Sequence, residues 1–191
     1  MDSLAPVLVL LGAVGCSQAA PLDSGKSGGL SDDGADTNLP LDTAVPEPRD
    51  PNADVVLNEL LSGDSEGGPD WIELYNRGTA VADLTGWQLT DALDDDDTPA
   101  WTLPDNTTIG VQAHLVVFAD GDGGGGLRAD FKLSRDGETV TLLDSAGRIA
   151  GEVDCPPLLD DQSYGRAADG GDPWVVLATP SQGASNWAAN P

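Results

Sequence analysis

Two glutamates in successive predicted strands are the residues best suited to acid–base chemistry. Glu59 lies in the apolar run 55–61, and Glu73 lies in the run 71–76. If the two strands pair, the carboxylates become neighbours, and paired carboxylates are the machinery of a glycosidase. Acids on regular strands more often serve structure, because buried polar groups are usually hydrogen-bonded within the fold. The sequence therefore predicts no catalytic site.

The single histidine and the second cysteine lead to the same conclusion. His114 stands at the start of a predicted strand, and no G-x-S-x-G motif supplies a nucleophile for a Ser-His-Asp site. We predict that it is a surface residue. Cys155 follows Asp154, whose charge raises rather than lowers a thiol pKa. We expect a small packed residue at a strand end, and no enzyme activity.

The strand 71–76 also offers a candidate binding face. A period of two puts Trp71, Glu73 and Tyr75 on one side of it. A carboxylate between two aromatic rings can hydrogen-bond sugar hydroxyls while the rings stack on the sugar. The alternative is that loops cover this face and that Glu73 accepts hydrogen bonds from the protein itself.

Two acidic loops are the candidate calcium site. Hard oxygen ligands on glycine-rich loops are what Ca²⁺ prefers, although neither loop has the full EF-hand pattern. The candidate ligands are Asp91, Asp94, Asp95, Asp96, Asp97, Asp120 and Asp122. The alternative is a pair of solvated acidic loops without an ion, because runs of like charge usually face water. No other cofactor is expected.

Charge and composition exclude several classes of protein. The 191 residues include 8 Lys and Arg against 33 Asp and Glu, for a net charge of −25. Such a chain repels nucleic-acid phosphates and anionic lipid surfaces. Two cysteines are too few for a disulfide scaffold or for a zinc site built from four cysteines.

The N-terminus predicts export. Residues 4–15 form an apolar run, too short for a bilayer span of roughly 20 residues but suited to a signal peptide. The segment 13–16, Ala-Val-Gly-Cys, resembles the lipobox of bacterial lipoproteins, which implies cleavage after residue 15 and acylation of Cys16. We therefore expect a cell-envelope protein, an outer-membrane lipoprotein that contacts the membrane only through its lipid. The alternative is a cleaved secretory signal without lipid.

The next segment, residues 16–53, predicts a flexible linker. Gly, Ser, Asp and Pro dominate it, and no aromatic residue appears. Such a composition cannot bury enough apolar surface to offset the entropy of ordering. A chain of this length reaches about 30–35 Å as a random coil, which would hold the domain clear of a membrane.

From residue 54 the pattern changes to short apolar or alternating runs separated by turn residues. Many short strands of this kind predict an all-β sandwich or barrel. The predicted strands cover residues 55–61, 71–76, 84–91, 100–103, 114–119, 138–143, 149–154 and 174–177.

These runs also resemble a known family. The segments VVLNEL at 55–60, DWIELYN at 70–76 and DLTGWQLTD at 83–91 follow the order of the bacterial lamin-tail domain. Further matches are LVVFA at 115–119, GETVTLLD at 137–144, SYGR at 163–166 and the ending ATPSQGASN at 178–186. The resemblance implies an immunoglobulin-like β-sandwich over residues 54–187, followed by a tail at 188–191.

What the resemblance implies for function is a binding or attachment module. We expect a non-catalytic domain tethered to the cell envelope, whose partner is a protein, a glycan or a cation-bridged surface polymer. The loops 91–97 and 120–126 are the expected contact regions, because loops vary without disturbing a core. A carbohydrate-binding module, with or without calcium, and a purely structural envelope protein are the alternatives.

Overall fold

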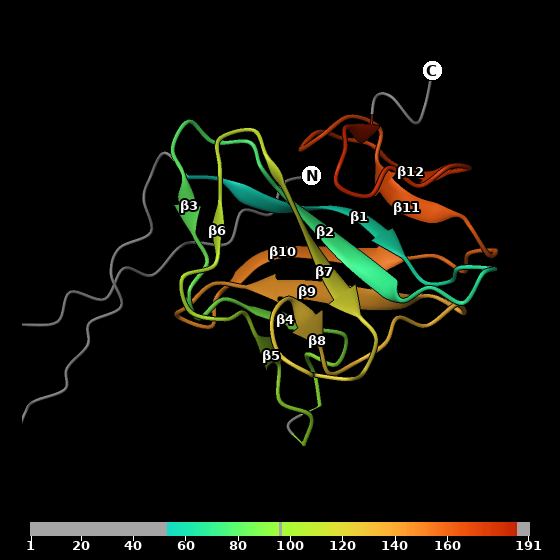
Figure 1. Ribbon diagram of the computed structural model, residues 1–191, viewed down its shortest axis with the longest axis horizontal. Helices are drawn as coiled ribbons and strands as arrows, with labels where there is room; N and C mark the ends of the chain where they lie inside the picture. Colours follow the sequence, from blue (N-terminus) through green and yellow to red (C-terminus); the bar gives the residue numbers. More distant parts are fainter. Residues whose placement is uncertain (1–52, 96, 187–191) are drawn as a thin grey trace, which may run out of the picture. The chain divides into compact units, whose positions relative to one another are not determined.

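The computed structural model describes residues 53–95 and 97–186. Within them the chain forms an all-β domain with twelve strands, arranged as two facing sheets and a two-stranded ribbon (Figure 1). The predicted signal peptide, Cys16, the C-terminal tail and all but the last residue of the predicted linker lie outside the described residues. The described part holds no helix long and apolar enough to cross a membrane.

The larger sheet has six strands in the order β12-β11-β1-β2-β7-β8. All its neighbours pair antiparallel except β7 and β8, which are parallel. Its strands are β1 (Val55–Leu61), β2 (Asp70–Asn76), β7 (His114–Ala119), β8 (Arg128–Ala129), β11 (Ser163–Arg166) and β12 (Trp174–Leu177).

The smaller sheet has four antiparallel strands in the order β10-β9-β4-β5. These are β4 (Gln88–Thr90), β5 (Trp101–Thr102), β9 (Glu138–Leu143) and β10 (Ile149–Cys155). The ribbon pairs β3 (Ala82–Asp83) with β6 (Thr108–Ile109).

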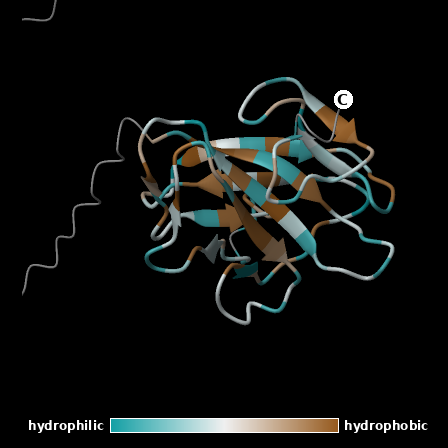
Figure 2. Cartoon of the chain, turned by 45° about the horizontal axis from the view of Figure 1, so that its top comes forward, coloured by the Kyte–Doolittle hydropathy of each residue, from teal (hydrophilic) through white to brown (hydrophobic). Residues whose placement is uncertain are grey.

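The core lies between the two sheets because each contributes the apolar side chains of one face. Leu57 and Leu74 from the larger sheet join Leu89 and Leu142 from the smaller one in a single buried cluster. Figure 2 shows apolar residues gathered on the strands and hydrophilic residues mainly on the connecting loops. The predicted immunoglobulin-like β-sandwich is confirmed.

The strands predicted over residues 55–61, 114–119, 138–143 and 174–177 coincide with β1, β7, β9 and β12. The strand predicted over 84–91 is wrong in its first half. Leu84 O accepts a hydrogen bond from Trp87 N at 3.0 Å, and Gly86 adopts a φ of 73°. This tight turn separates the ribbon strand β3 from β4, because a left-handed glycine cannot continue a strand.

Strand β11 is the most important element that the prediction omitted. It contains four residues, Ser-Tyr-Gly-Arg, with a glycine in its interior. Short polar runs with glycine carry little strand signal. In the structure β11 pairs with both β1 and β12, so it joins the C-terminal part of the chain to the centre of the larger sheet.

Candidate functional site

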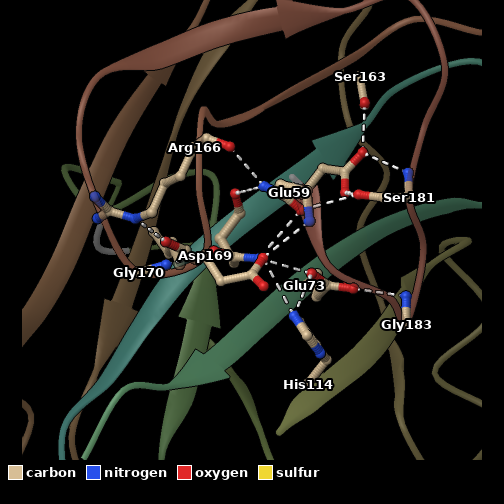
Figure 3. Close-up of polar contacts among 12 residues, drawn as sticks. Glu59, Glu73, His114, Ser163, Arg166, Asp169, Gly170, Ser181 and Gly183 are labelled. Atoms are coloured by element: carbon tan, nitrogen blue, oxygen red, sulfur yellow. Dashed lines mark hydrogen bonds and ion pairs between the residues drawn. The ribbon is translucent and has the colours of Figure 1, made fainter. Parts of the chain in front are cut away.

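The outer face of the larger sheet carries a group of buried and half-buried polar residues, which we call the polar cluster. Figure 3 shows these side chains pointing toward one another from β1, β2, β7, β11 and the chain that follows β11. Its members are Asn58, Glu59, Glu73, His114, Ser163, Asp169, Ser181 and Asn186.

A β-bulge places two neighbouring residues of β1 in the polar cluster. Leu57 pairs with Leu74 and Glu59 pairs with Glu73, so Asn58 has no partner of its own on β2. A bulge interrupts the alternation of side chains along a strand. As a result Asn58 and Glu59 both join the polar cluster, while Leu57 joins the core.

The Glu59 carboxylate is completely buried and accepts three hydrogen bonds. Ser163 Oγ donates to Oε1 at 2.5 Å, and Ser181 N donates to the same oxygen at 3.0 Å. Ser181 Oγ donates to Oε2. A charged acceptor that several donors surround in this way compensates for much of its lost hydration.

The Glu73 carboxylate is also completely buried and receives two hydrogen bonds. Asn58 Nδ2 donates to Oε1 at 2.9 Å, and the backbone N–H of Gly183 donates to Oε2 at 2.6 Å. Burial raises the pKa of Glu73 above its ordinary value, and these two hydrogen bonds oppose the rise only in part.

His114 and Asp169 form the solvent-facing side of the polar cluster. His114 Nε2 lies 3.3 Å from Asp169 Oδ1 and 4.0 Å from Glu73 Oε1. Burial alone would raise the pKa of Asp169, but hydrogen bonds from Asn186, Ser185, Asn58 and His114 outweigh it and hold the pKa below its usual value.

Residues 178–186, which we call the C-terminal clasp, cover the two glutamates. The clasp supplies Ser181 to Glu59 and Gly183 to Glu73 (Figure 3). Asn186 ties its end down, donating through Nδ2 to Arg166 O at 2.8 Å and through its backbone N–H to Asp169 Oδ1 at 3.0 Å. The clasp therefore closes the face on which the carboxylates lie.

Glu59 and Glu73 are neighbours, as the sequence indicated, but they are not open to a substrate. Neither side chain has any exposed surface, and their oxygens accept hydrogen bonds from the protein. General acid–base catalysis requires a side chain within reach of the substrate. The alternative interpretation of this face, a covered surface with Glu73 hydrogen-bonded internally, is confirmed.

The aromatic residues of the candidate sugar face differ from each other in exposure. Trp71 is buried, with 4% of its surface exposed, so its ring offers almost no area for stacking. Tyr75 is half-buried and lies against His114, with ring centroids 4.9 Å apart. Of the two rings that a stacked sugar would need, only Tyr75 reaches solvent.

His114 begins β7, as expected, but it is half-buried rather than the exposed surface residue that we predicted. Only 14% of its side chain is exposed, because the pairing of β7 with β2 sets it beside Tyr75 and Glu73. Cys155 is buried at the end of β10, as predicted, and forms no disulfide with any residue in 53–95 or 97–186. Burial raises its pKa to about 11, so its thiol stays protonated near neutral pH.

The acidic loops present most of their carboxylates to solvent. Asp94, Asp95, Asp97 and Asp122 are exposed, and Asp96 lies outside the described residues. Asp91 lies at a groove of about 560 Å³ against β9 and β10. Asp120 pairs with Arg128. Among residues 53–95 and 97–186 we find no three acidic, histidine or cysteine side chains placed to hold a metal ion. Calcium binding stays a prediction.

Sequence reasoning missed most of the polar cluster. It identified Glu59 and Glu73 but not Asn58, Ser163 or Ser181 as their partners. The sequence signal that could have pointed to these partners is the ending at residues 178–186. The lamin-tail resemblance includes this segment but assigns it no role. Its contacts with β1 bridge 122 positions of sequence, from Ser181 to Glu59.

Comparison with known proteins agrees with this architecture. A sequence model of the family described as Lamin Tail Domain matches residues 48–155. The match covers β1 to β10 and ends before β11, β12 and the C-terminal clasp. No curated protein matches the chain.

Proposed function

The chain belongs to the lamin tail domain family, and from this premise we propose that it is a non-catalytic module held at a membrane surface, where it binds a protein or polymer partner. One observation carries the proposal. The side chains best suited to chemistry, Glu59 and Glu73, are fully buried and hydrogen-bonded within the domain. They stabilise a scaffold, and this leaves the exposed loops for recognition.

The loops support the choice of contact region. Asp94, Asp95 and Asp97 are exposed at one end of the smaller sheet, and the glycine-rich loop 120–126 is almost entirely exposed. The net charge of −25 favours a partner with positively charged groups, because opposite charges steer association. We infer that the 91–97 loop meets such a partner.

A loop variant tests this part of the proposal. We expect that replacing Asp94, Asp95 and Asp97 with Asn abolishes the capture of a partner that the full-length chain crosslinks in an envelope extract. The matched control removes three exposed carboxylates elsewhere, at Asp105, Asp130 and Asp136. If the control loses capture equally, net charge and not the loop accounts for binding. If both variants retain capture, the loop is not the contact region.

We propose further that an acyl chain on Cys16 provides the attachment. The apolar run 4–15, followed directly by cysteine, supports this. The same run is too short to span a bilayer, so it would not itself anchor the chain. A single acyl chain gives only marginal membrane affinity, so stable anchoring requires more than one chain on or near this residue.

Two cysteine variants test the anchor. In a bacterial host fed an alkyne fatty acid, we expect the full-length chain to be labelled and to enter the detergent-extracted membrane fraction. Cys16→Ser should lose both the label and the membrane fraction. Cys155→Ser is the control and should keep both, because Cys155 is buried in the folded domain. A Cys16→Ser chain that is still labelled would reject acylation at this residue.

A further inference from the structure

A groove beside the end of β1 gathers positive charge in a strongly acidic chain. It has a volume of about 580 Å³ and lies between the β1–β2 loop and the segments around β8. Its lining includes Arg128, Lys132 and Arg135, three of the eight Lys and Arg in the sequence. The acids in the lining are Asp70 and Asp120, and Asp160 outside the lining lies beside Arg135.

The existing ion pairs leave one cation without an acidic partner. Arg128 pairs with Asp120, and Arg135 Nη1 lies 2.5 Å from Asp160 Oδ1 outside the lining. The Arg135–Asp160 pair is about half exposed, so water screens it. Lys132 forms no ion pair within the part of the chain that the structure describes. Burial raises the pKa of Asp70 in the same lining, and the charges of Arg135 and Lys132 oppose the rise without direct pairing. The Lys132 ammonium can therefore still pair with a ligand.

A buried hydroxyl in the same lining lacks a hydrogen-bond partner. Ser62 directly follows β1 and has 2% of its surface exposed. Its Oγ is buried and makes no hydrogen bond with any described residue. Leaving a buried polar group unsatisfied is unfavourable, and such groups in folded proteins call for an explanation. A ligand atom that accepts a hydrogen bond from Ser62 Oγ would remove this cost.

Two glycines make room for the basic side chains at this groove. A Cβ at Gly63 would lie 2.8 Å from Arg135 Nε, and one at Gly121 would lie 3.2 Å from Lys132 Cγ and Cε. The two side chains therefore pack along backbone that any larger residue would obstruct. This packing limits the conformations of long side chains whose immobilisation otherwise costs binding free energy.

We propose that this groove binds a carboxylate-bearing ligand, whose carboxylate accepts a hydrogen bond from Ser62 Oγ and pairs with Lys132. With the Arg128–Asp120 and Arg135–Asp160 pairs in place, Lys132 is the basic side chain of the lining that is left to meet a ligand, and a carboxylate supplies the one negative charge that pairs with it. The volume exceeds that of a carboxylate and lies within the range of small-ligand sites. The ligand therefore has a body beyond its acid group, as a free organic acid or an acidic peptide side chain does.

Titration of the ¹⁵N-labelled full-length chain tests the proposal at constant ionic strength. Propionate supplies the carboxylate, and propionamide is its uncharged analogue. We expect propionate to shift the amide signals of Ser62, Gly67 and Gly68 saturably, with half-saturation on the order of millimolar, and propionamide to leave them unchanged. The second ligand is an acetylated, amidated pentapeptide with one central Glu. If it binds tenfold more tightly than propionate, the natural ligand is an acidic side chain of a polypeptide. If it binds as tightly as propionate, the natural ligand is a free organic acid.

Three variants complete the experiment. Lys132→Gln and Ser62→Ala should each weaken propionate binding about tenfold or more, as expected for the loss of a hydrogen bond to a charged group. Arg148→Gln removes the same charge outside this groove, and it should leave half-saturation unchanged. The proposal is overturned if propionamide reproduces the shifts, or if half-saturation is the same in Lys132→Gln, Ser62→Ala and the unmodified chain.

Discussion

At the residue scale, two buried carboxylates face each other across β1 and β2. Glu59 and Glu73 are register partners, and like charges placed opposite each other destabilise a sheet. Hydrogen bonds from serines and from the backbone of the clasp stabilise Glu59, and Glu73 receives an amide and a backbone N–H. The arrangement depends on every donor being in place, because a partly satisfied buried network is costly.

Replacing Glu73 with Gln should change how stability depends on pH. The folded-state pKa of Glu73 is raised above 4.5, so the folded protein holds this proton more tightly than the unfolded chain does. The stability that Glu73 contributes is therefore full below pH 4.5 and is lost as pH rises through the folded-state pKa. We expect the free energy of unfolding of the unmodified chain, relative to Glu73→Gln, to fall over that window. Urea unfolding in pH steps measures it.

The exposed residue Glu66 provides the matched control for this measurement. Glu66→Gln removes a carboxylate of the same kind from an exposed position, so the Glu73→Gln difference is compared with it at every pH. A Glu73→Gln difference that is flat, or that rises with pH, would contradict the interpretation. Asp169, with its lowered pKa, acts in the opposite direction and loses its contribution as pH falls, so only the difference between variants isolates Glu73.

At the scale of single elements, β11 packs closely against its neighbouring strands and the clasp at Gly165. A Cβ at Gly165 would lie 3.0 Å from both Glu59 Cγ and Leu177 Cδ1 and 3.1 Å from Asn186 Nδ2. Its neighbours belong to β1, β12 and the clasp, all packed closely. Strand β11 therefore requires a residue without a side chain at this position, even though glycine weakens a strand.

Gly165→Ala should destabilise the domain by about 1–3 kcal/mol, the usual cost of inserting a methyl group into a packed site. Gly151→Ala in β10 is the matched control, because the nearest atom to its Cβ, Leu57 Cδ1, would be 3.9 Å away in ordinary contact. Urea unfolding of both variants gives the comparison. Equal stability of the two would show that β1, β12 and the clasp adjust freely around the added methyl group.

At the scale of the whole molecule, the described domain extends beyond the segment that matches the family. The match ends at residue 155, yet β11 and β12 occupy one side of the larger sheet and the clasp covers its outer face. The chain after residue 155 is therefore part of the folded domain rather than an appendage. Stability of the polar cluster depends on contacts between the two ends of the described chain.

Truncation after Leu177 should lower the unfolding temperature and speed hydrogen exchange in β1 and β2. It removes the Ser181 and Gly183 donors and leaves the two buried carboxylates short of partners, at a cost of about 1–3 kcal/mol for each unsatisfied group. Truncation after Asn186 is the control, because it keeps Ser181, Gly183 and the contacts of Asn186. Thermal unfolding followed by circular dichroism measures the difference. Equal midpoint temperatures for the two truncations would refute a structural role for the clasp.

Local patterns in the sequence were sufficient to predict the class of fold. Alternating apolar residues and turn residues predicted most strands, including the full extent of β1, β7, β9 and β12, because strand formation and turn chemistry are properties of neighbouring residues. Their positions on successive predicted strands made Glu59 and Glu73 candidates for contact. The apolar run 4–15 and Cys16, from which we predict a signal peptide and acylation, are also local patterns.

Only the tertiary structure decided the roles of the candidate residues. The bulge at Asn58 turned an alternating strand into one with two polar cluster residues, and the clasp buried both glutamates. These contacts join residues such as Glu59 and Ser163 that are 104 positions apart, and no local pattern specifies which distant segment will cover a face. The same reason explains why Ser62 and Lys132 meet at one groove only in the folded chain.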